Sequence, residues 1–172
     1  MTERITKYRW FWVWDFEKEE RWLNEMAANG WALVSVGYCR YTFERTDCNE
    51  YTVRLEMHPF DDGYVEFMEE TGAEYIGRVL QWMYFRKSSD LGRFDLFSDI
   101  DSRLSHVTGI HRMVLALGMA NLLIGLVNLF HGSSVNSTVA AFNLLVATML
   151  MYGVGRIRGK IEYLEREREL RE

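Results

Sequence analysis

The chain is poor in the residues that most catalytic, metal-binding and disulfide-rich proteins need. It has two cysteines, four histidines and one proline among 172 residues. Cys39 and Cys48 are too few for a disulfide framework and lack a Cys-x-x-Cys spacing. No metal-ligand spacing or nucleophile motif includes the histidines, which are His58, His106, His111 and His131. We therefore expect no catalytic residue, no metal site and no cofactor, and we do not expect an enzyme.

The chain also lacks an excess of basic residues. Its formal net charge is −5, whereas proteins that bind nucleic acid usually present a basic face. The first ten residues, MTERITKYRW, contain no apolar signal region. We therefore expect neither direct nucleic-acid binding nor a cleavable signal peptide.

Two long stretches near the C-terminus lack ionisable residues altogether. They are Met113–Phe130 and Thr138–Val154. As helices, both are just long enough to cross a hydrocarbon core of roughly 30 Å. This pattern predicts a transmembrane hairpin over residues 112–156, with spans of about 113–130 and 138–155 in the cell membrane. The alternative is a buried helical hairpin of a soluble protein.

The charges that flank these stretches predict an orientation. Arg112 precedes the first stretch, and Arg156, Arg158 and Lys160 follow the second. The loop between the stretches contains no lysine or arginine. Because positive flanks mark the cytoplasmic side of a span, we expect a protein with two spans whose N- and C-termini are both cytoplasmic.

Small and amide residues form one stripe along each apolar stretch. They recur at helical spacing, so each set shares one face. The stripes are Gly118, Asn121, Gly125 and Asn128, and Asn136, Ala140, Asn143 and Ala147. Small residues let helices approach closely and amides can hydrogen-bond across the contact, so the stripes predict packing of the hairpin or of a homodimer. The alternative is a polar path for a substrate.

Residues 1–88 have the pattern of a cytoplasmic α+β domain. Aromatic and β-branched stretches alternate with two amphipathic stretches, each of which ends near a glycine. The expected strands are Lys7–Trp14, Trp31–Arg45, Glu50–His58 and Glu74–Arg86, and the expected helices are residues 16–29 and Tyr64–Thr71. This β-α-β-β-α-β order predicts a ferredoxin-like fold, with one four-stranded antiparallel sheet and both helices on one face. We detect no internal repeat.

Alternation along these strands predicts which side chains face the helices. One parity gives a core that includes Trp10, Trp12, Trp14, Leu33, Tyr41, Phe43, Val53, Leu55, Met83 and Phe85. The other parity gives an open face that mixes arginines with aromatic residues, with Arg9, Phe11, Arg40, Arg54, Arg78, Trp82 and Tyr84 as the predicted interaction residues. Such a face packs against a second copy or the following segment, or it binds a partner or a small anionic ligand.

Two further segments flank the hairpin. Residues 89–111 are a linker followed by an amphipathic helix, with apolar residues at Phe97, Ile100, Leu104 and Val107. Residues 157–172 form a charged cytoplasmic tail, which we expect to be helical and solvated.

Three motifs in the first half of the chain resemble those of a bacterial family. The first runs from Glu19 to Leu33 and reads Glu-Glu-Arg-Trp-Leu-Asn-Glu-Met-Ala-Ala-Asn-Gly-Trp-Ala-Leu; the others are Tyr41-Thr-Phe43 and Tyr51-Thr-Val-Arg-Leu55. In these motifs the chain is similar to the domain of unknown function 2812. The resemblance implies a membrane-anchored protein associated with a transcriptional regulator of the PadR type, and it implies no catalytic residue.

These observations lead to one expected function and one alternative. We expect a membrane-anchored accessory, sensing or interaction protein, non-catalytic and linked to a PadR-type regulator. Its expected partners are the lipid bilayer, that regulator or a membrane complex, and a second copy in a homodimer. The alternative is a small subunit of a membrane transporter or channel complex, which would use the Asn/Gly stripes.

Overall fold

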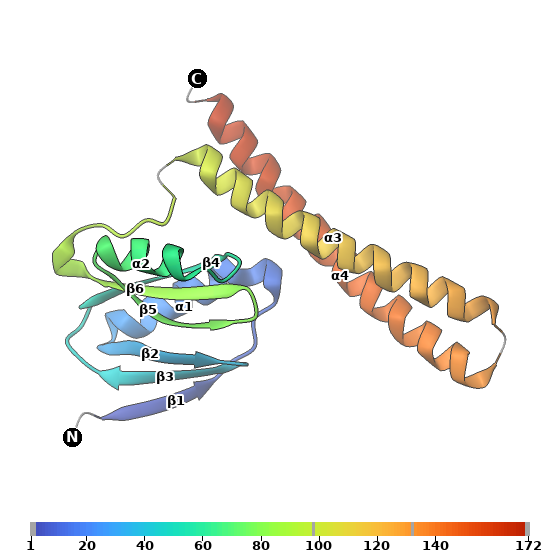
Figure 1. Cartoon of the computed structure of the whole chain (residues 1–172), viewed down its shortest axis with the longest axis horizontal. Coiled ribbons are helices and arrows are strands. Elements are labelled where there is room, and N and C mark those ends of the chain that lie inside the picture. The colour runs from blue at the N-terminus through green and yellow to red at the C-terminus, as the bar shows by residue number, and fades with distance from the viewer. Residues whose placement is uncertain (1–2, 98, 132, 171–172) are drawn as a thin grey trace. The chain divides into compact units, whose positions relative to one another are not determined.

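The computed structural model describes residues 3–97, 99–131 and 133–170. The chain divides into two units, Met1–Leu96 and Phe97–Glu172 (Figure 1). The domain boundary that we expected at residue 88 is eight residues too early (96 minus 88). Unit 1 extends to Leu96, because Phe94 packs into its core and Asp95 pairs with Arg54. The two units are described separately below.

The described part of unit 1 contains six strands and two α-helices. In chain order they are β1 (Arg4–Tyr8), α1 (Phe16–Ala28), β2 (Trp31–Gly37), β3 (Arg40–Arg45), β4 (Tyr51–Met57), α2 (Asp62–Glu70), β5 (Ala73–Val79) and β6 (Trp82–Ser88). Short 3₁₀ turns at Val13–Asp15 (η1) and Ser89–Leu91 (η2) precede α1 and follow β6. The α+β class is therefore confirmed.

The strands form two antiparallel sheets of three strands each. Their orders are β1-β3-β2 and β4-β6-β5. The sheets adjoin along β2 and β5 (Figure 1). Arg86, which pairs with Glu74 of β5, donates from Nη1 to the carbonyl oxygen of Leu33 at 2.9 Å. Since Val36 lies against Gly77 further along both strands, β2 and β5 run in the same direction.

Unit 1 consists of two successive β-α-β-β motifs, β1-α1-β2-β3 and β4-α2-β5-β6. Positive-φ glycines precede β2 and β5, at Gly30 and Gly72, which are 42 residues apart (72 minus 30). A register shift follows Leu33 in the first hairpin and Tyr75 in the second, again 42 residues later (75 minus 33). The prediction that the chain lacks an internal repeat is thus wrong at the level of structure.

The ferredoxin-like prediction of one four-stranded sheet is also wrong. Both long expected strands, Trp31–Arg45 and Glu74–Arg86, are hairpins that turn at residues 38–39 and 80–81. These turns contain no glycine, proline or asparagine, and their strained residues are Cys39 (φ 53°) and Leu80 (φ 56°). They lie inside aromatic stretches, so no turn signal interrupted the strand pattern. The first expected strand is shorter as well, because β1 ends at Tyr8.

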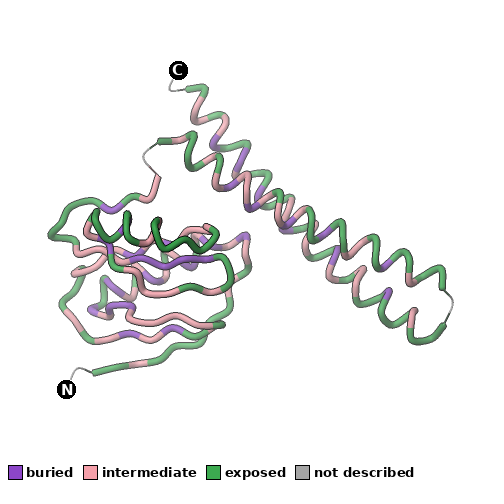
Figure 2. Tube along the Cα trace, viewed as in Figure 1, coloured by how far each residue is buried: buried purple, intermediate pink, exposed green. Residues whose placement is uncertain are grey.

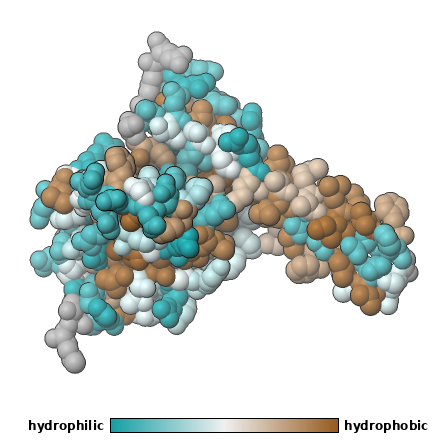
Figure 3. Space-filling model, viewed as in Figure 1, coloured by the Kyte–Doolittle hydropathy of each residue, from teal (hydrophilic) through white to brown (hydrophobic). Residues whose placement is uncertain are grey.

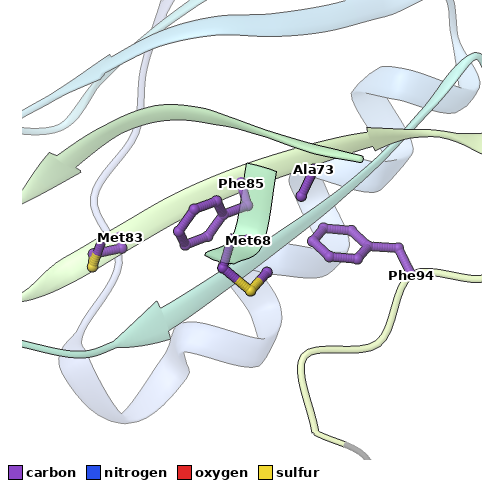
Figure 4. Packing of buried hydrophobic residues seen from close by; sticks show 5 residues of the cluster. All are labelled: Met68, Ala73, Met83, Phe85 and Phe94. Carbon is purple, nitrogen blue, oxygen red and sulfur yellow. The ribbon is translucent and has the colours of Figure 1, made fainter. Parts of the chain in front are cut away.

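Strand β6 is buried on both of its faces. Met83 and Phe85 pack with Met68 of α2, Ala73 and Phe94 (Figure 4). On the opposite face, Tyr84 and Trp82 contact α1 through Glu19 and Phe16. The buried segments in Figure 2 follow this arrangement. Helix α1 therefore contacts both sheets, because Tyr41 of β3 also bonds to Glu19.

Unit 2 is an antiparallel pair of long helices. Helix α3 runs from Ile100 to Phe130 and α4 from Ser134 to Glu169. The side chains of Asp99 and Ser133 cap their N-termini by accepting from backbone N–H groups at 2.7 and 3.1 Å. Each helix continues through an expected span and the adjacent expected segment, so the amphipathic helix and the charged tail extend the hairpin. At 1.5 Å per residue, each is roughly 45–55 Å long.

The outer surface of the pair is apolar and exposed. Figure 3 shows hydrophobic side chains over this part of the chain. Both helices are long and apolar enough to cross a membrane. The exposed apolar residues include Leu117, Leu123, Ile124, Val127, Phe142, Leu145 and Met149.

Candidate functional site

The seven residues of the predicted interaction face do not share one surface. Trp82 and Tyr84 are 9% and 4% exposed, so the prediction that they lie on an open face is wrong. The prediction failed because α1 covers the face of β6 that we expected to be bare. Phe11 is half-buried and packs on Trp22. Whether any of these residues binds a partner remains a prediction.

Tyr84 belongs to a buried cluster around Glu19. The hydroxyls of Tyr84 and Tyr41 both donate to Glu19 Oε1, at 2.6 and 2.8 Å. Burial raises the pKa of the Glu19 carboxyl, and the two hydrogen bonds oppose that rise. The cluster joins α1 to one strand of each sheet. Glu19 opens the first sequence motif, but no local pattern indicates that two tyrosines from different hairpins bond to it.

Arg54 is held by ion pairs on strand β4. It lies 3.3 Å from Glu20 of α1 and 3.6 Å from Asp95. Next to it, Asn24 of α1 bonds to both backbone groups of Val53 at 2.9 Å. Helix α1 therefore covers the outer edge of β4 with side-chain hydrogen bonds, as a neighbouring strand would. Arg54 thus has a structural role in joining α1, β4 and the segment after β6.

The three remaining arginines, Arg9, Arg40 and Arg78, are exposed and lie at one end of unit 1. Strands β1, β2, β4 and β5 all end there, because each pairs antiparallel with β3 or β6 and β2 runs parallel to β5. The β5–β6 turn meets the end of β4, where the His58 N–H donates to the Gln81 carbonyl at 2.9 Å. The Arg9 N–H likewise donates to Cys39, in the β2–β3 turn, at 3.0 Å.

The same end carries a concentration of exposed apolar side chains, which we name the aromatic rim. Among the described residues of unit 1, only Phe67 and Leu91 are large, apolar, exposed and outside it. Trp10 is 63% exposed and Trp12 39%, so their predicted place in the core is wrong. The aromatic rim consists of Tyr8, Trp10, Trp12, Tyr38, Phe60 and Leu80.

The aromatic rim continues into the core through stacked rings. Trp10 meets Trp12 edge to face at 5.3 Å between ring centroids. Trp12 stacks on the buried Trp14 at 5.1 Å. These contacts place the exposed rings on a rigid base, which favours their use as a binding surface.

Basic residues surround the aromatic rim. Arg9 lies over the rings of Phe11 and Trp22 at 5.0 and 5.1 Å, and Arg78 lies over Phe60 at 4.4 Å. Lys7 and Arg40 are exposed on β1 and β3. The sequence predicted these arginines but not their grouping with Trp10 and Trp12, because that grouping depends on where the strands end.

The small residues of the hairpin stripes lie where α3 and α4 meet. A Cβ on Gly118 would lie 3.0 Å from Met151 Cε, and one on Gly125 would lie 2.9 Å from Leu144 Cδ2. Ala140 and Ala147 are buried. These four residues therefore allow the close approach of the two helices that the sequence predicted.

Three amide residues of the stripes form hydrogen bonds within their own helices. Asn121, Asn128 and Asn143 each donate to the carbonyl four residues earlier in their own helix, at 2.8, 2.8 and 2.9 Å. Each amide keeps a second N–H group and its Oδ1 for another partner. Hydrogen bonding of these amides across the hairpin or to a second copy therefore stays a prediction.

Polar residues that could act chemically are few in the part of the chain that the structure describes. It contains no group of three or more His, Cys, Asp or Glu side chains that could hold a metal ion. Cys39 is half-buried and Cys48 exposed, and both are free thiols. Glu56, whose pKa is raised by burial, accepts a 2.5 Å hydrogen bond from Tyr64.

The fold and surfaces define an α+β domain of two β-α-β-β repeats joined to an apolar helical hairpin. The family described as Protein of unknown function (DUF2812) matches residues 15–119. The chain belongs to this family, and the match covers α1 through most of α3. No curated protein and no solved structure matches the chain.

Proposed function

We propose that this protein is a membrane-anchored, non-catalytic accessory protein that holds an α+β interaction domain at the cytoplasmic face of the cell membrane. The observation that carries the proposal is the apolar outer surface of α3 and α4. Side chains such as Leu123, Ile124 and Phe142 point away from the helix pair. In water this surface would favour aggregation, whereas in lipid it needs no protein partner.

The charges at the ends of the hairpin support cytoplasmic termini. Because the two helices are antiparallel, Arg112 and the group Arg156, Arg158 and Lys160 lie at the same end of the two apolar stretches. The loop at the other end contains no lysine or arginine. Under the positive-inside rule, this asymmetry orients unit 1 toward the cytoplasm.

The proposed role of unit 1 is to bind a protein, and a PadR-type regulator is the first partner to test. The family resemblance supports that choice of partner. The alternative, a small transporter or channel subunit, has less support. Its working residues would be Asn121 and Asn143, whose amides already bond within their own helices.

Membrane extraction and partner capture test the two parts of this proposal. The full chain should stay in the membrane fraction after extraction at alkaline pH, and extraction into the soluble fraction would contradict the anchor. Crosslinking in native membranes followed by purification of the full chain should recover a PadR-type regulator. Recovery of only transporter subunits would favour the alternative.

A further inference from the structure

We propose that the aromatic rim binds the surface of an anionic membrane, so that unit 1 lies on the bilayer to which the hairpin anchors it. The inference rests on the proposed function, because it assumes that unit 1 is tethered on the cytoplasmic side. It adds a second membrane contact, made by a folded domain whose sequence has no transmembrane character.

The side chains of the aromatic rim have the chemistry of the membrane interface. Tryptophan and tyrosine combine an apolar ring with a polar group, and they concentrate at the level of the lipid headgroups. Trp10 and Tyr8 are 63% and 75% exposed. The hairpin turns add Tyr38 and Leu80, which are 73% and 69% exposed. A soluble domain seldom leaves such side chains together at one end without an apolar surface to cover them.

The charge around the aromatic rim identifies anionic lipid as the surface it fits. Four exposed basic residues border it: Lys7, Arg9, Arg40 and Arg78. They are concentrated on a chain whose net charge is −5. Basic residues beside interfacial aromatic residues are attracted to the negative potential of the cytoplasmic leaflet.

The acidic residues at this end do not remove that attraction. Asp15 pairs with Lys18 at 2.9 Å. Asp61 accepts from the Gly63 N–H at 3.0 Å as the N-cap of α2. Asp62 and Glu17 lie in the first turns of α2 and α1. Positive charge therefore predominates beside Tyr8, Trp10 and Tyr38, and the aromatic rim should meet lipid through that side.

The length of the tether permits this contact. The part of α3 before the apolar stretch, residues 100–112, would extend roughly 20 Å from the membrane. That distance is less than about 25–30 Å, the diameter expected for a folded domain of about a hundred residues. Unit 1 can therefore contact the bilayer surface while the hairpin remains inserted.

The tryptophans of the chain make the contact directly measurable. All six belong to unit 1 and none to the hairpin, at positions 10, 12, 14, 22, 31 and 82. Quenching of their fluorescence by lipids brominated near the headgroup therefore reports contact of unit 1 with lipid, even when the hairpin is fully inserted. The full chain is reconstituted in phosphatidylcholine vesicles with or without phosphatidylglycerol.

We expect quenching with phosphatidylglycerol and little with phosphatidylcholine alone. The double variant Trp10→Phe/Trp12→Phe should lose most of the quenching, while the matched control Trp31→Phe, at the opposite end of unit 1, should keep it. The double variant Lys7→Gln/Arg40→Gln should lower the ratio of docked to undocked protein about fivefold for each charge removed.

Three outcomes would overturn the proposal. The first is absence of quenching in protein that resists alkaline extraction, which would leave the proposed anchor intact. The second is equal quenching in both lipid mixtures. The third is crosslinking of Tyr38→Cys between two copies with no quenching, which would assign the aromatic rim to a homodimer. Loss of resistance to alkaline extraction is a separate result and contradicts the proposed function itself.

Discussion

The two halves of unit 1 share a topology but differ in what covers them. Strand β3 of the first half is equivalent to β6 of the second. Leu33 pairs with Phe43 in the first half and Tyr75 with Phe85 in the second, and each residue of the second pair lies 42 positions after its counterpart (75 minus 33, 85 minus 43). Burial nevertheless alternates along β3, whereas four successive residues of β6 are buried. The difference arises because α1 contacts both sheets, whereas α2 covers only the second. Repetition of a motif therefore sets strand pairing, while neighbours decide burial.

The largest expected effect comes from removing a buried side chain of α1. Leu23 is 0% exposed, so Leu23→Ala should lower the free energy of unfolding by about 2–5 kcal/mol. The equivalent test on α2, Met68→Ala, should cost less, because Met68 is the one buried residue of α2 and is still 6% exposed. Denaturant titration of the full chain in detergent, followed by tryptophan fluorescence, measures both. Equal losses would contradict the difference between the helices.

The next largest effect should come from replacing the equivalent glycines of the two halves, Gly30 and Gly72. Gly30 and Gly72 both have positive φ, so alanine strains either backbone. At Gly30 the new Cβ would lie 2.7 Å from the Thr46 carbonyl oxygen, whereas at Gly72 it would meet the Leu91 side chain at 2.9 Å. Because a side chain can move aside more easily than backbone, Gly30→Ala should cost about 3 kcal/mol and Gly72→Ala about 1. The same titration checks the order, which the reverse ranking would contradict.

The covered edge of β4 gives a smaller and more local effect. Asn24→Ala removes both hydrogen bonds to Val53 and should cost about 1–3 kcal/mol. Hydrogen exchange should accelerate at Val53, while amides of the exposed edge strand β1 keep their rates. Asn24→Asp, which retains the acceptor for the Val53 N–H, is the matched control. Unchanged exchange at Val53 in Asn24→Ala would show that α1 does not protect this edge.

The smallest expected effect is a change in pH dependence. Burial raises the pKa of Glu19 above its ordinary value of 4.5 in the folded state. The folded chain therefore holds this proton more tightly than the unfolded chain, so its stability should fall as pH rises above 4.5. Glu19→Gln should lose that contribution, so the unfolding free energies of wild type and variant should diverge between pH 4 and pH 7. Parallel curves would contradict a buried, titrating carboxyl.

The sequence predicted the elements that have strong local signals. The hairpin, the two helices of unit 1 and the core positions Leu33 and Phe43 follow from apolar periodicity. It did not predict the turns at residues 38–39 and 80–81, because their positive-φ residues are Cys39 and Leu80, which carry no turn preference. Without a signal at these turns, the sequence pattern predicts four strands instead of six and does not show the repeat.

The candidate site was predicted only in part. Arg9, Arg40 and Arg78 are exposed as expected, while Trp82 and Tyr84 are buried. Period-two alternation separates two faces of a strand but does not say whether both faces are covered. The grouping of the arginines with Trp10 and Trp12 depended on strand direction across two sheets, which no local pattern contains.

The central claim, that a two-span hairpin anchors a cytoplasmic domain, is tested most directly by cysteine accessibility in intact cells. Cys48 is exposed in unit 1, and the hairpin has no native cysteine. A membrane-impermeant thiol reagent should leave the wild type unlabelled until the cells are opened. It should label Ser134→Cys, placed in a Cys39→Ser/Cys48→Ser background, from outside. Labelling of Cys48 in intact cells, or protection of Ser134→Cys, would contradict the account.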